Sequence, residues 1–263
     1  MPEIIQYFLF VGFAGLMVLL RLDARRFSAA EWDTEDGEWR IWLSRLTWYA
    51  AGLALGLLIF ALHPSPVSDL NLVLAPDRGE ALVLGLAYGG AGVVAAFVLA
   101  VVRNGRISLP RPGRYPGGVL MSVGTAFYDE FLFRGVLLGL LLSLDLPDWL
   151  AVVTAASIYA GAVRASTGSR GILMLLVVLA IGLVSGALVL MTAGIAAAFV
   201  GHAVTRFALF MTMGQPEQAV VEQVAPPVQG TADSQAYVIP PRGYPRTGDE
   251  DDGRGGYGPV RPG

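Results

Sequence analysis

The stretch AFYDEFLFRGVLLGLLL, residues 126–142, is as apolar as a membrane span yet contains three ionisable residues. Asp129, Glu130 and Arg134 lie within six residues of one another. A charged side chain at the centre of a bilayer costs roughly 2.5–3.5 kcal/mol on insertion scales, and such residues usually face the interior of a helix bundle. Arg134 follows Glu130 by four residues, which places both on one helix face. The stretch therefore predicts a polar site buried among membrane helices.

The composition of the whole chain agrees with a membrane protein. Of its 263 residues, 54% are hydrophobic and 15% are charged, whereas soluble domains have about 25% charged residues. The mean hydropathy is +0.59. The chain has no cysteine, which excludes a cysteine nucleophile and thiolate metal sites. The small net charge of −3 does not suggest nucleic acid as a partner.

Apolar runs near the roughly 20 residues that a membrane-spanning helix needs recur along the chain. The sequence predicts an all-α fold, a polytopic transmembrane helix bundle of about seven spans. The runs are apolar on all sides, which suits contact with lipid, and they are rich in the small residues that allow close helix packing in membranes. The fourth run is long enough to be tilted or kinked. The predicted spans are 3–20, 41–62, 81–102, 117–144, 149–163, 171–190 and 194–213.

The distribution of arginine predicts the orientation in the cell membrane. The first and third connections and the C-terminal tail contain four arginines each, whereas the fourth and sixth connections contain none. By the positive-inside rule, the N-terminus is outside and the tail is cytoplasmic in this multi-pass arrangement. We expect three regions: an N-terminal region of three spans (1–116), a core of four spans (117–213) and a disordered cytoplasmic tail (214–263). The tail is rich in proline and glycine and poor in apolar residues.

A second set of ionisable residues lies in the later spans. The stretch VGHAVTRFALF in the seventh span contains His202 and Arg206 at the same four-residue spacing, and Arg164 ends the fifth span. Intramembrane ionisable residues are a functional-site hypothesis by default. The alternative is that they pair only to fix the register of the helices.

These residues carry a resemblance to a known family. DEFLFRG resembles the first signature of the CPBP family of CAAX-processing and bacteriocin-processing intramembrane proteases, E-E-x-x-x-R followed by glycine. Glu130, Arg134 and Gly135 match this signature, and Asp129 stands at its first Glu. The glycine-rich span, the Thr-Ala-Gly turn and the final span resemble the family's closing pair of helices. The resemblance covers roughly residues 117–213.

Two positions of the family pattern are changed. In the final H-x-x-x-N motif His202 matches, but Arg206 stands at the Asn. The counterpart of the family's F-x-x-x-H motif is the stretch SIYAGAVRAS. One alignment of this stretch places Arg164 at the His. The other aligns Tyr159 with the Phe and places Val163 at the His. In either alignment that histidine is absent.

The resemblance implies cleavage of peptide bonds within the membrane, with lipid and a membrane protein or peptide as partners. It assigns Glu130 as general base, Asp129 as the group that orients it and His202 as ligand or hydrogen-bond donor, with Arg134 in the same motif. It also implies a divalent metal such as zinc, but a catalytic zinc normally needs three protein ligands, and here Glu130 and His202 are the most that the motifs supply.

The substitutions leave three hypotheses open. The first is an active endopeptidase with an altered site. The second is a catalytically impaired pseudoprotease that acts as a membrane binding or scaffold protein, because Arg164 and Arg206 could pair directly with the carboxylates and make them poor proton acceptors. The third is a transporter or channel, which the lack of paired halves disfavours. For Arg164 a position at the membrane interface is an alternative.

Overall fold

The computed structural model describes residues 3–27, 39–105, 107, 109–110, 112–167 and 172–213, and its described elements are all helical. The all-α prediction is therefore confirmed for this part of the chain, while the predicted tail (214–263) lies outside it. The α-helices are α1 (Glu3–Leu22), α2 (Trp39–Leu62), α3 (Pro66–Asp69), α4 (Arg78–Asn104), α5 (Tyr115–Asp129), α6 (Leu138–Leu142), α7 (Asp148–Thr167), α8 (Ile172–Thr192) and α9 (Ala196–Met213).

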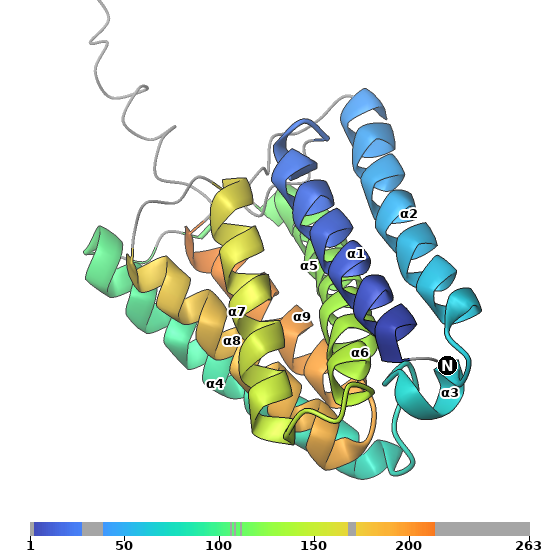
Figure 1. Ribbon diagram of the computed structural model, residues 1–263. Coiled ribbons are helices and arrows are strands. Elements are labelled where there is room, and N and C mark those ends of the chain that lie inside the picture. The colour runs from blue at the N-terminus through green and yellow to red at the C-terminus, as the bar shows by residue number, and fades with distance from the viewer. Residues whose placement is uncertain are drawn as a thin grey trace, which may run out of the picture. The chain divides into compact units, whose positions relative to one another are not determined.

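The long helices alternate in direction, so that their connections gather at two opposite ends of the bundle (Figure 1). Three helical segments are long and apolar enough to cross a membrane: Trp42–Leu62, Arg78–Val102 and Ile172–Thr192. Tyr7–Leu22 and Ala196–Thr212 are shorter apolar helices. These segments indicate a membrane protein, and the count of seven spans stays a prediction.

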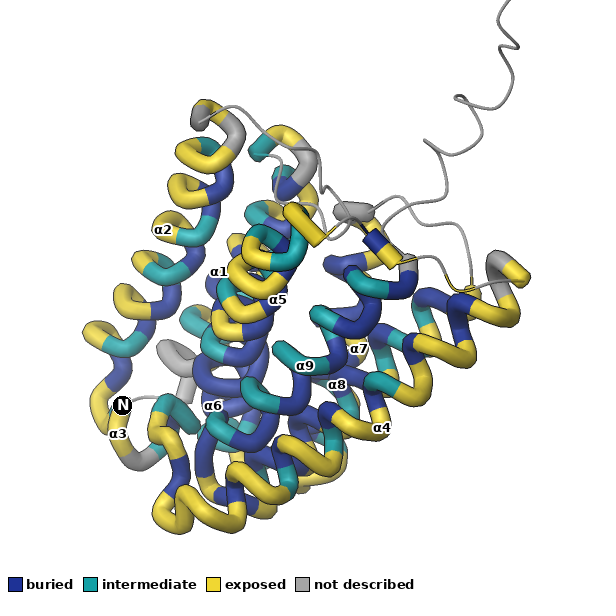
Figure 2. Tube along the Cα trace, turned by 180° about the vertical axis from the view of Figure 1, so that it is seen from behind, coloured by how far each residue is buried: buried dark blue, intermediate teal, exposed yellow. Residues whose placement is uncertain are grey.

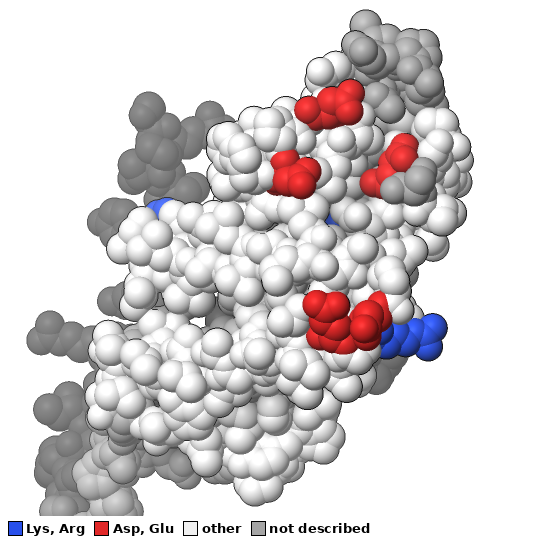
Figure 3. All heavy atoms as spheres, turned by 90° about the horizontal axis from the view of Figure 1, so that it is seen from below, with Lys and Arg blue, Asp and Glu red and all other residues white. Residues whose placement is uncertain are grey.

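The surface of the bundle is suited to lipid. Exposed positions follow the outward side of α2 (Figure 2), and they include Leu43, Leu46, Leu57 and Leu58. Such a contiguous apolar surface is rare on soluble monomers. Charged side chains gather instead at the ends: seen from below, acidic side chains stand out on a mostly uncharged surface (Figure 3). Asp77, Glu80, Asp145 and Asp148 are exposed near the ends of α4, α6 and α7.

The fourth predicted span is one continuous helical stretch with an unusual centre. A π-helix, Glu130–Leu137, joins α5 to α6. π-Helical turns are rare and occur frequently at functional sites. The segment between α3 and α4 lies against this stretch, because the backbone N–H of Asn71 donates to the Gly135 carbonyl over 3.2 Å. A Cβ at Gly139 would lie 2.7 Å from the Asp69 carbonyl oxygen, so glycine permits this close approach.

Helices α4 and α9 pack closely against each other, and glycine makes the approach possible. Gly85, Gly89 and Gly92 are buried and lie on one face of α4. A Cβ at Gly85 would be 2.9 Å from the carbonyl oxygen of Ala197, and one at Gly92 would overlap the side chain of Thr205. Small residues on a helix face allow this packing where lipid, as apolar as the side chains, provides little hydrophobic driving force. The contact fixes α9, which carries His202 and Arg206, against α4.

We expect Gly92→Leu to lower the free energy of unfolding in mild detergent by about 1–3 kcal/mol, because the new side chain must displace Thr205. Gly90→Leu on the same helix is the matched control, since a Cβ there meets nothing within 4 Å. Equal stability of the two variants would contradict the close packing of α4 on α9.

Candidate functional site

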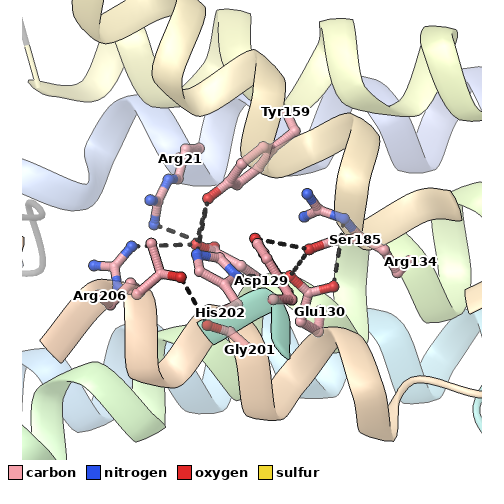
Figure 4. Close-up of polar contacts among 11 residues, drawn as sticks. Arg21, Asp129, Glu130, Arg134, Tyr159, Ser185, Gly201, His202 and Arg206 are labelled. Carbon is pink, nitrogen blue, oxygen red and sulfur yellow. Dashed lines mark hydrogen bonds and ion pairs between the residues drawn. The ribbon is translucent and has the colours of Figure 1, made fainter. Parts of the chain in front are cut away.

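Asp129 and Glu130 lie at the junction between α5 and the π-helix, in the interior of the bundle. Both side chains are 0% exposed. A carboxylate in such a place needs charged or hydrogen-bonding partners, because an isolated buried charge is very costly. The partners come from four further helices, α1, α7, α8 and α9, and Figure 4 shows them converging on the two carboxylates.

Asp129 lies between two arginines. Its Oδ1 is 3.6 Å from Nη1 of Arg21, which is in the last turn of α1, and its Oδ2 is 3.6 Å from Nη1 of Arg206 on α9. The Tyr159 hydroxyl on α7 also donates to Oδ2, over 3.2 Å. Two guanidinium groups and a hydroxyl thus supply the partners that this buried carboxylate needs.

Glu130 has a separate set of partners. His202 Nδ1 lies 2.6 Å from Oε1, and the Ser185 hydroxyl on α8 donates to the same oxygen over 3.1 Å. An ionised carboxylate only accepts hydrogen bonds, so the imidazole nitrogen is the donor in this contact. Oε2 lies 3.4 Å from Nε of Arg134. The predicted pairing of Glu130 with Arg134 one turn later is therefore present.

The side chains of Tyr159 and Arg134 connect the partners of Asp129 with those of Glu130. The Tyr159 hydroxyl lies 3.5 Å from His202 Nε2 as well as beside Asp129, so it joins the two carboxylate groups. The Arg134 guanidinium stacks on the Tyr159 ring, with Cζ 4.3 Å from the ring centroid. Cation–π stacking of this kind contributes about 2 kcal/mol or more when desolvated. The packing fixes the positions of both side chains.

The structure brings together five of the six residues that the sequence predicted for the site. Asp129, Glu130, Arg134, His202 and Arg206 meet in one cluster. Arg164 differs: it is exposed near the end of α7. Its exposure agrees with the alternative of an interfacial position, which a long arginine side chain reaches easily from a helix end.

Sequence reasoning missed three members of the cluster, Arg21, Tyr159 and Ser185. Arg21 was assigned to the first connection, but it lies in α1 and is 1% exposed. Its position near the end of an apolar run gave no reason to separate it from the arginines that follow. Tyr159 was considered only as an aligned Phe, and Ser185 resembles the many small residues of such spans. One feature of the sequence could have indicated these three residues as members of the site: each is a polar side chain inside or bordering a predicted span.

The described residues do not fit a catalytic zinc. They contain no group of three His, Asp or Glu side chains arranged to hold a metal ion. His202 and Glu130 are close together, but Asp129 is directed toward two guanidinium groups, which repel a cation and cannot bind one. The divalent metal that the family resemblance implied therefore has no adequate ligand set in this cluster.

The comparison with protein families confirms the resemblance seen in the motifs. Residues 112–208 match the family model described as type II CAAX prenyl endopeptidase Rce1-like. This range begins just before α5, ends within α9 and contains every cluster residue except Arg21. No curated protein and no solved structure matches the chain.

Proposed function

We propose that this chain is a membrane protein with a CAAX-protease-like core that does not hydrolyse peptides and instead acts as a membrane binding or scaffold protein. The observation that supports this most strongly is the pairing of Asp129 with Arg21 and Arg206 at 3.6 Å each. Asp129 stands at the first carboxylate of the family signature, where the resemblance assigns the group that orients the general base Glu130. Two guanidinium groups, which are always protonated, pair with Asp129 instead and draw it away from that role.

The second candidate function is an active intramembrane endopeptidase, and the contact between His202 and Glu130 favours it. A 2.6 Å contact between an imidazole and a carboxylate resembles the orienting contact in many acid–base sites. In this reading Glu130 and His202 activate water, and Arg206 donates hydrogen bonds to the developing oxyanion in place of a neutral amide. The two functions differ in whether a peptide is cleaved.

The membrane arrangement belongs to the same proposal. The alternation of helix directions (Figure 1) supports seven spans. The arginines of the first and third connections and of the tail support a C-terminal tail on the cytoplasmic side.

The deciding experiment is a cleavage assay with purified protein in lipid and a panel of transmembrane and CAAX-type peptides, read by mass spectrometry. We expect no cleavage product from the wild type and none from Glu130→Gln. Glu80→Gln is the matched control, since Glu80 is an exposed carboxylate near the start of α4. Cleavage by the wild type and by Glu80→Gln that disappears in Glu130→Gln would replace the proposal with the active endopeptidase.

A further inference from the structure

The space between Asp129 and His202 is filled by the oxygen of a third side chain. Hydrolysis by a carboxylate and an imidazole needs a water molecule within hydrogen-bonding reach of both groups. Here the oxygen in that position belongs to Tyr159, 3.2 Å from Asp129 Oδ2 and 3.5 Å from His202 Nε2. We infer that the Tyr159 hydroxyl occupies the place of a hydrolytic water and covers His202 Nε2. This inference rests on the proposed non-hydrolytic function and names Tyr159 as a positioning residue for it.

The hydrogen bonds of the imidazole show why this contact matters. His202 Nδ1 donates to Glu130, so this nitrogen is already engaged. Nε2 is therefore the ring nitrogen left to contact a water, and it faces the Tyr159 hydroxyl oxygen, whose proton is donated to Asp129. A water at this place could lose a proton and attack a carbonyl carbon. The Tyr159 oxygen is bonded to its ring, so it cannot be added to a carbonyl carbon as the hydroxide of a hydrolysis reaction.

The packing of Tyr159 keeps its hydroxyl in this position. The residue is 1% exposed. Phe133 contacts its ring edge-on, with centroids 4.9 Å apart, and the Arg134 guanidinium covers a face of the ring. Both neighbours belong to the π-helix that begins at Glu130. The same helical segment thus supplies a carboxylate of the site and the surroundings that hold the tyrosine against it.

The chain suits a direct test, because it contains only two histidines, His63 and His202. Solid-state ¹⁵N NMR of histidine-labelled full-length protein in lipid reports which ring nitrogen carries the proton, and His63→Gln assigns the two rings. In the wild type we expect His202 to carry its proton on Nδ1. In Tyr159→Phe we expect the Nε2 resonance to shift, because this nitrogen loses the oxygen that it contacts.

Tyr49→Phe is the matched control, since the Tyr49 hydroxyl pairs with Thr125 at 2.6 Å, and we expect this variant to leave the His202 signals unchanged. A wild-type spectrum without a proton on Nδ1, or an Nε2 resonance that stays in place in Tyr159→Phe, would overturn the inference. The wild-type spectrum of His202 can still overturn the inference if Tyr159→Phe fails to fold. Because no peptide is present, this result is independent of the cleavage assay, in which the proposed function itself can fail.

Discussion

Replacing Asp129 with alanine is expected to lower the free energy of unfolding by about 3–5 kcal/mol, because two guanidinium groups then lose the carboxylate that they share. Breaking a buried ion pair by removing one partner typically has a cost of this size. The measurement is chemical unfolding in mild detergent, together with the yield of folded protein.

An exposed ion pair of the same length provides the control. Asp23 pairs with Arg26 at 3.6 Å, but the two side chains are 51% and 80% exposed. Asp23→Ala should change the free energy of unfolding by less than about 1 kcal/mol, since water screens such pairs. If Asp129→Ala is as mild as Asp23→Ala, the buried cluster does not stabilise the bundle in the way described.

Removing Arg134 is expected to have the second large effect, a loss of about 3–5 kcal/mol in the free energy of unfolding. Its guanidinium faces Glu130 at 3.4 Å and stacks on Tyr159, so Arg134→Leu leaves a buried carboxylate without its cation. The double variant Arg134→Leu with Glu130→Gln removes that unpaired charge as well. It should therefore be more stable than Arg134→Leu alone, and the reverse order would show that this pair is not the stabilising contact.

Part of this site could be predicted from sequence because helical spacing is a local property. Glu130 and Arg134, and likewise His202 and Arg206, are four residues apart in apolar stretches, so each pair lies on one buried helix face. The all-helical fold follows from the same apolar runs. The family motifs then placed the two stretches in one site, which the structure bears out through the contact of His202 with Glu130.

The remainder depends on which helices meet, and no local pattern specifies this. Arg21 reaches Asp129 because α1 packs beside α7 and the π-helix, whereas its sequence context is that of an arginine at a membrane border. Arg164 has a similar context and is exposed. The π-helix makes tertiary contacts, such as that of Asn71 with Gly135, which no local pattern specifies either. A single sequence does not reveal which of two border arginines turns inward.

Arg21 and Arg206 hold Asp129 in buried ion pairs, and the proposed function rests on this pairing. The pair with Arg206 is measured most directly by a double-mutant cycle between Asp129→Asn and Arg206→Leu, with unfolding free energies determined in one detergent. Residues in one buried network show interaction energies of about 0.5–3 kcal/mol. We predict a favourable coupling of about 1.5–3 kcal/mol, because the 3.6 Å contact lies in the interior, with Asp129 0% and Arg206 11% exposed. A coupling within about 0.5 kcal/mol of zero would contradict the claim, since it would leave Asp129 free of Arg206.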